Sequence, residues 1–123
     1  MGDLAERTVR LAGNSGNRYE FALYPLEHRF VHTRDAVYVV GRLNQREAGE
    51  ADFEPLFVSQ TGLLAERINE HRRNGCFNAD EATHVGVYTV LSEPLRIAIV
   101  NDLIKRHAPR CPGLERCGAC RFA

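Results

Sequence analysis

Four basic side chains gather near the middle of this chain and could bind phosphate. They are Arg67, His71, Arg72 and Arg73. The apolar spacing predicts a helix over residues 62–73, which places positions 67 and 71 on one face. A planar, permanently charged guanidinium can bind phosphate oxygens and offset the charge of a reacting phosphoryl group. The alternative is a solvated helix face on which Glu66 and Glu70 form weak surface ion pairs with the arginine at position 67.

A histidine and three cysteines near the C-terminal end could bind zinc. They are His107, Cys111, Cys117 and Cys120. A Cys-x2-Cys pair is half of a common zinc-binding motif, and two upstream nitrogen or sulfur ligands could complete a tetrahedral site. Cys76 is another candidate for the fourth ligand. Because the spacings match no standard zinc finger, free thiols and a redox-active or disulfide-forming pair are the alternatives.

Composition predicts a single globular domain. The 123 residues are 44% hydrophobic and 26% charged, and 16 basic side chains balance 16 acidic ones. A neutral net charge counts against tight nucleic-acid binding, although clustering of charge matters more than its sum. The charge is polarised, with a basic segment at 103–123 and acidic residues in the middle of the chain. These acidic residues are Glu47, Glu50, Asp52 and Glu54.

Membrane and secretory signals are missing from the sequence. No apolar run approaches the roughly 20 residues that span a bilayer, and the N-terminal residues lack the pattern of a secretory signal. We therefore expect a cytoplasmic protein with no membrane partner. In that compartment, the four cysteines are expected to be reduced thiols or metal ligands rather than disulfides.

The elements that must position these side chains are predicted to be strands first and helices later. The predicted strands are residues 8–11, 18–23, 36–42, 54–59 and 83–91. Polar residues 44–52 are expected to form an exposed loop. A second helix should begin after Ser92 as N-cap and end near His107. This order predicts an α+β fold, with helices flanking a small, mainly antiparallel sheet that begins with an N-terminal hairpin.

Four segments in this order resemble the GIY-YIG nuclease family. They are the apolar strand 36–40, Phe57-Val58-Ser59-Gln60-Thr61-Gly62, the helix with Arg67 and His71, and residues 96–104 leading to Pro109. The similarity covers about residues 36–112 and is closest to small bacterial members in which an N-terminal hairpin precedes the core. The hairpin extension would then be residues 1–34, and the tail residues 113–123.

The resemblance implies a vestigial nuclease site. Tyr38 stands where the family has a Tyr implicated in activating water, and Arg67 stands at the position of its catalytic Arg. Without the resemblance, Tyr38 would be read as a strand residue packed against the core. His71 falls one helical turn after Arg67, on the same face.

Other family positions have changed. Phe57 replaces the second Tyr and Ser59 a Gly, while Pro112 stands where the family has an Asn. The metal-binding Glu of the family falls at Val100, which cannot coordinate Mg²⁺, and Asp102 is rotated by about 200° around the helix. We therefore predict a degenerate domain that binds DNA or another phosphate-bearing ligand with little or no catalysis.

Two other functions remain open from the sequence. One is an endonuclease that requires Mg²⁺ or Mn²⁺ and has a rearranged site containing Tyr38, Arg67, His71 and Glu70. The other is a protein-interaction module, in which the acidic loop matters more than Arg67. Phosphate contacts would weaken steeply as salt rises, which distinguishes a nucleic-acid partner from a protein partner. The sequence does not indicate an oligomeric state.

Overall fold

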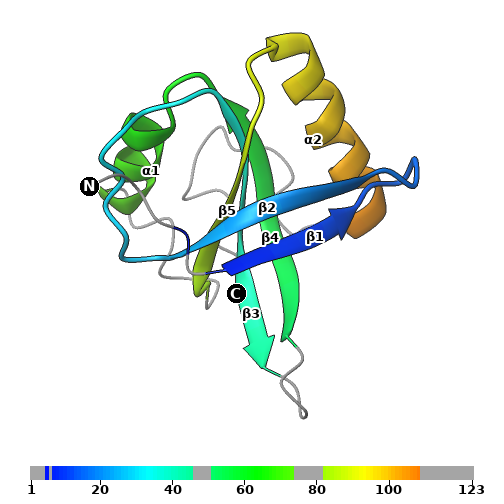
Figure 1. Ribbon diagram of the computed structural model, residues 1–123, viewed down its shortest axis with the longest axis horizontal. Helices are drawn as coiled ribbons and strands as arrows, with labels where there is room; N and C mark the ends of the chain where they lie inside the picture. The colour runs from blue at the N-terminus through cyan, green and yellow to red at the C-terminus, as the bar shows by residue number, and fades with distance from the viewer. Residues whose placement is uncertain (1–4, 6, 46–50, 74–81, 109–123) are drawn as a thin grey trace.

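A computed structural model describes residues 5, 7–45, 51–73 and 82–108 of the chain (Figure 1). Its strands are β1 (Arg7–Ala12), β2 (Arg18–Pro25), β3 (Ala36–Gln45), β4 (Ala51–Thr61) and β5 (His84–Thr89), and its helices are α1 (Leu64–Arg73) and α2 (Glu93–His107). The strands form one curled antiparallel sheet in the order β1-β2-β5-β3-β4. The expected α+β class with an antiparallel sheet and flanking helices is confirmed.

The N-terminal hairpin is part of this sheet. Strands β1 and β2 pair antiparallel, and β2 also pairs with β5 from Ala22 opposite Val87 to Pro25 opposite His84. The predicted hairpin is therefore confirmed, and its second strand is joined by backbone pairing to the expected core region.

The expected loop at residues 44–52 is wrong at both of its ends. Strand β3 continues to Gln45 and β4 begins at Ala51, with these two residues paired. An apolar pair explains the extension, because Leu43 lies opposite the buried Phe53 and packs against the same core. Glu47 and Glu50 of the acidic loop lie outside the described residues.

Helix α1 begins two residues later than the sequence predicts. The Thr61 hydroxyl accepts a hydrogen bond from the backbone N–H of Leu63 at 3.0 Å, so residues 62 and 63 form a turn. The backbone N–H of Leu64 then donates to the carbonyl of Arg34 at 3.1 Å. Capping of α2 follows the prediction, because the Ser92 side chain accepts from the backbone N–H of Leu95.

The two faces of the sheet carry separate cores, because successive strand residues point to opposite sides. On β3, Tyr38 and Val40 belong to the cluster on the α1 side, whereas Val37 and Val39 belong to the cluster on the α2 side. Leu64 and Ile68 extend the α1-side cluster, as the predicted apolar stripe of that helix requires. Ile99 and Leu103 extend the α2-side cluster. The two helices therefore cover different faces of one sheet.

No helix among the described residues is long and apolar enough to cross a bilayer.

Candidate functional site

A buried tyrosine–histidine pair connects β3 to α1. The Tyr38 hydroxyl lies 2.8 Å from Nε2 of His71, and both side chains are buried, with exposed fractions of 0% and 2%. Phe57 packs at the edge of both rings, with ring centroids 5.9 Å from Tyr38 and 5.6 Å from His71. The structure thus brings together three of the residues that the sequence assigns to a vestigial site.

Arg67 connects this buried pair to the protein surface. Its guanidinium hydrogen-bonds to the Tyr38 hydroxyl and forms an ion pair with Glu70, whose Oε1 lies 2.8 Å from the guanidinium NH1 nitrogen. A guanidinium can only donate, so the Tyr38 oxygen accepts from Arg67, and the direction of the Tyr38–His71 hydrogen bond is set by the tautomer of the histidine. Ser59, opposite Tyr38 on β4, also hydrogen-bonds to this hydroxyl. The result is a chain of hydrogen-bonded side chains from the surface to the core.

The buried pair is uncharged at neutral pH. Burial lowers the pKa of His71 to about 4, and the nearby Arg67 charge lowers it further while Glu70 opposes the shift. Burial also raises the pKa of Tyr38, against the opposing effect of its hydrogen bond with Arg67. His71 is therefore a neutral side chain in the core rather than a cation that could bind phosphate.

A hollow of about 400 Å³ lies where Arg67 reaches the surface. It is lined by the end of β4, the turn that follows and one side of α1, through Gln60, Thr61, Leu63, Glu66, Arg67, Glu70 and Arg73. The Arg67 side chain is 35% exposed, so part of its guanidinium can meet a ligand in the hollow. The hollow contains two arginines and two glutamates, which makes its formal charge zero.

Thr61 presents a hydrogen-bond donor to this hollow, whereas the Gln60 side chain is directed to α2. Gln60 lies opposite Val37, on the α2 side of the sheet, and its Oε1 accepts a hydrogen bond from Nε of Arg96 at 2.8 Å. Arg96 is itself fixed, because it is buried and its guanidinium donates to the backbone carbonyls of Val90 and Leu91. The Thr61 hydroxyl accepts from the backbone N–H of Leu63, so its proton remains available for donation.

The predicted four-residue phosphate patch is only partly assembled. Arg67 and Arg73 line the hollow, but His71 is buried beneath it. Arg72 is directed elsewhere, because its guanidinium donates to the backbone carbonyls of Leu26 and His28. The four residues lie within about two turns of α1, but their side chains point in different directions around the helix axis, which separates them.

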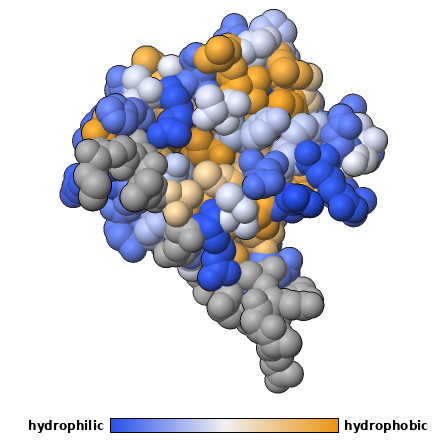
Figure 2. Space-filling model, viewed as in Figure 1, coloured by the Kyte–Doolittle hydropathy of each residue, from blue (hydrophilic) through white to orange (hydrophobic). Residues whose placement is uncertain are grey.

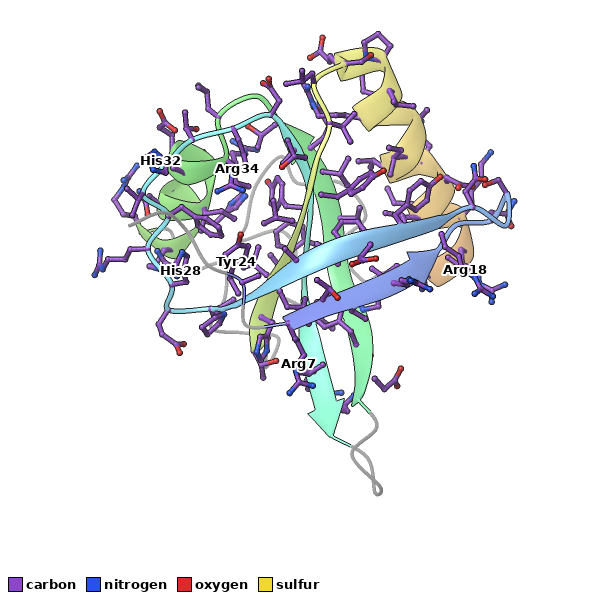
Figure 3. All side chains as sticks on the ribbon, in the orientation of Figure 1. Arg7, Arg18, Tyr24, His28, His32 and Arg34 are labelled. Carbon is purple, nitrogen blue, oxygen red and sulfur yellow. The ribbon has the colours of Figure 1, made fainter. Side chains whose placement is uncertain are left out.

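The segment that Arg72 contacts carries further basic side chains beside α1. Figure 3 shows His28, His32 and Arg34 around this helix, whereas Arg7 and Arg18 project from the N-terminal hairpin. The ring of His28 packs against Tyr24 and Phe30, with ring centroids 4.9 Å and 4.8 Å away. Arg72 therefore fastens the segment to α1 instead of facing the hollow.

Val100 does not lie with the other residues of the expected vestigial site. It packs against the α2-side core, on the opposite face of the sheet from Tyr38. Asp102 points to the hairpin turn, where its carboxylate accepts from the Ser15 hydroxyl at 2.7 Å and the Tyr19 hydroxyl at 2.7 Å. The expectation that Asp102 is directed away from Val100 is confirmed. Pro112 lies outside the described residues.

His107, the first predicted zinc ligand, makes a structural contact. Its Nε2 lies 2.8 Å from the backbone carbonyl oxygen of Ala12, and since a carbonyl only accepts, this nitrogen carries a proton. A protonated nitrogen cannot bind a metal ion, so only Nδ1 could serve. The cysteines at 76, 111, 117 and 120 lie outside the described residues. Within the part that the structure describes, no group of three or more His, Cys, Asp or Glu side chains could hold a metal ion.

Arg96 and Gln60 are the parts of the site that the sequence reasoning missed. A signal existed for Arg96, because positions 96, 99 and 103 share one helical face and all three are buried. A similar signal existed for His71, which follows Leu64 by two turns and Ile68 by one. No sequence pattern pairs Arg96 with Gln60, since the contact joins α2 to the end of β4.

Comparisons with protein-family models, with curated proteins and with solved structures each find no match to this chain.

Proposed function

We propose that this protein is a degenerate GIY-YIG-like domain that binds nucleic acid or another phosphate-bearing ligand through Arg67, with little or no catalysis. The observation that carries the proposal is the position of Arg67, held by a buried tyrosine at one end and open to a surface hollow at the other. A guanidinium fixed in this way is preorganised for phosphate oxygens, because less side-chain freedom is lost on binding.

The order of elements supports the family part of the proposal. A hairpin of β3 and β4 leads into α1, and β5 then pairs antiparallel with β3 before α2. This is the order in which the resembling motifs occur in the sequence, with Tyr38 on the first strand and Arg67 on the first helix. The family assignment remains a proposal, and its support is this order together with the motifs.

Three observations favour binding over catalysis. The Tyr38 hydroxyl is buried and already hydrogen-bonded, so activating a water molecule would require the core to open. Position 100 faces the other core and offers no carboxylate to a metal ion at the hollow. Of the two carboxylates that line the hollow, that of Glu70 is paired with Arg67.

Salt-dependent binding of an oligonucleotide tests the proposal. The change in fluorescence anisotropy of a labelled single-stranded oligodeoxyuridylate would be followed with the wild-type protein and with Arg67→Gln. Arg42→Gln is the matched control, because Arg42 is 33% exposed and pairs with Glu54 at 2.9 Å on the distant part of the β3–β4 hairpin. We expect Arg67→Gln to weaken binding by about tenfold and to flatten its dependence on salt, and Arg42→Gln to do neither.

Two results would contradict the proposal. Equal affinity of the two arginine variants and the wild type would remove Arg67 as the contact. Nicking of supercoiled plasmid that requires Mg²⁺ or Mn²⁺ and disappears in Arg67→Gln would show a working nuclease, in favour of the rearranged endonuclease site.

A further inference from the structure

The charge balance of the hollow restricts what can bind there. Arg67 and Arg73 offer positive charge, but Glu66 and Glu70 line the same hollow. A ligand that carries only anionic groups would be attracted by the arginines and repelled by the carboxylates. A ligand that also carries hydroxyl donors could use both kinds of side chain. The hollow is therefore suited to a ligand with a phosphate and a hydrogen-bond donor close to each other.

Both carboxylates keep acceptor capacity for such a donor. An ionised carboxylate has about four acceptor sites, and Arg67 occupies only one of those on Glu70, at Oε1. Glu66 is exposed on the preceding turn of α1, and a hydrogen bond from the Thr33 side chain lowers the pKa of its carboxyl. Hydrogen bonds from a ligand hydroxyl to an ionised carboxylate are stronger than those to a neutral acceptor.

A further donor for the phosphate lies at the end of β4, which lines the same hollow. The Thr61 hydroxyl can donate, since it already accepts from the backbone N–H of Leu63. The strand end therefore supplies a donor, whereas α1 supplies carboxylate acceptors beside its arginines.

We infer that the hollow prefers ribose over deoxyribose, with the carboxylate pair of Glu66 and Glu70 supplying the acceptor for the single 2′-hydroxyl proton of a nucleotide whose phosphate lies at Arg67. This inference rests on the proposed function, since it requires the phosphate contact. The 2′-hydroxyl is the group that lets a protein distinguish RNA from DNA at a given site. It supplies a donor next to the phosphate, which deoxyribose cannot do.

Three oligonucleotides of equal length and sequence test the inference. They are oligouridylate, oligodeoxyuridylate and 2′-O-methyl oligouridylate, each with the same fluorescent label. We expect the ribose form to bind about tenfold more tightly than the deoxyribose form, the ratio for one charge-assisted hydrogen bond. The 2′-O-methyl form keeps the oxygen but has no proton to donate, so it should bind as weakly as the deoxyribose form.

A double variant assigns the preference to the two carboxylates. Glu66→Met with Glu70→Met keeps the side-chain length, and should reduce the ribose preference to less than about twofold. Glu20→Met with Glu54→Met is the matched control. Glu54 is 46% exposed and pairs with Arg42, much as Glu70 is 47% exposed and pairs with Arg67. The control should keep the full preference, and thermal unfolding of both variants would verify that they are folded.

The possible failures are distinguishable. If none of the three oligonucleotides binds, the proposed binding of nucleic acid is itself wrong. If ribose and deoxyribose forms bind equally and both depend on Arg67, the proposed function stands and the ribose preference is overturned. A preference that persists in the Glu66→Met, Glu70→Met variant would overturn the role of these carboxylates.

Discussion

The two faces of the sheet use their polar residues differently. On the α1 side, Tyr38 and His71 place a hydrogen-bonded pair inside the core, and Arg67 continues it to the surface. On the α2 side the buried polar residue is Arg96, whose guanidinium is held by backbone carbonyls, and Asp102 binds the hairpin turn at the margin of the apolar cluster. Figure 2 shows the same contrast outside, with hydrophobic surface over the upper part of α2 and a mostly hydrophilic surface around α1.

This difference separates a candidate site from a structural contact. Burying a polar pair costs free energy unless each group has a hydrogen-bond partner. The Tyr38–His71 pair next to the hollow therefore indicates that the side chains around it are held in one specific geometry. The Asp102 contacts instead join two elements at the surface, which explains them without a ligand. The α1 face is therefore the better candidate for function.

The largest expected effect is a loss of folding stability in acid, caused by the buried histidine of the pair. The pKa of His71 is about 4 in the folded protein and near 6.5 when unfolded, so the unfolded chain binds more protons between these values. The contribution of the neutral His71 to the free energy of unfolding is fully present above pH 6.5 and is lost as the pH falls toward 4. The full shift corresponds to about 3 kcal/mol, and solvent entry around the ring reduces the expected loss to about 2 kcal/mol.

Two variants separate the histidine from its partner. His71→Phe fills the same space without titrating, so urea unfolding should show a smaller loss of stability between pH 6.5 and pH 4. Tyr38→Phe removes the hydroxyl but leaves the histidine buried, and should keep the pH dependence. An unchanged pH dependence in His71→Phe would contradict the comparison, because the buried pair would then contribute nothing to acid sensitivity.

Restoring the carboxylate expected from the family should harm the protein rather than activate it. Val100→Glu places a carboxylate against the apolar α2-side core, at an expected cost of about 1–2 kcal/mol. Asn101→Glu adds the same group at the next, exposed position and should leave stability within about 0.5 kcal/mol. Urea unfolding and plasmid nicking measure both effects. Metal-dependent nicking by Val100→Glu would mean that position 100 reaches the α1-side site.

The smallest effect concerns the hairpin turn. A Cβ at Gly13 would lie 1.8 Å from Oδ2 of Asp102, and this oxygen is held by Ser15 and Tyr19. Gly13→Ala should therefore cost about 1 kcal/mol by displacing the carboxylate. In an Asp102→Ala background the obstruction is gone, so the same change should cost less than in the wild type. Strictly additive costs in thermal unfolding would contradict this coupling.

Much of the fold could be predicted because it depends on local patterns. The β-branched and aromatic run at 36–40 predicts a strand, and Ser92 with Pro94 predicts the start of a helix, as the structure confirms. The extension of the β3–β4 hairpin could not be predicted in this way. It depends on a pair of residues across two strands, Leu43 and Phe53, within a segment that is mostly polar.

The site was harder to predict than the fold. The three nearby arginines predict a basic surface at His71, whereas its helical spacing from Leu64 and Ile68 indicates the core, where the structure places it. An interpretation from the charge of neighbouring residues therefore gives the wrong location for this side chain, and one from its position on the helix gives the right one. The link from Arg96 to Gln60 joins residues 36 positions apart, and local sequence contains no signal for it.

One titration tests most directly whether the α1 face is the functional one. Backbone amide signals of the ¹⁵N-labelled protein would be followed by NMR as an oligouridylate is added, with an oligodeoxyuridylate in parallel. We expect the largest shifts at Thr61 and along α1 from Glu66 to Arg73, with the α2-side residues near Asp102 unchanged. Shifts confined to the hairpin turn and α2, or no shifts at all, would contradict the assignment of the ligand site to the hollow at Arg67.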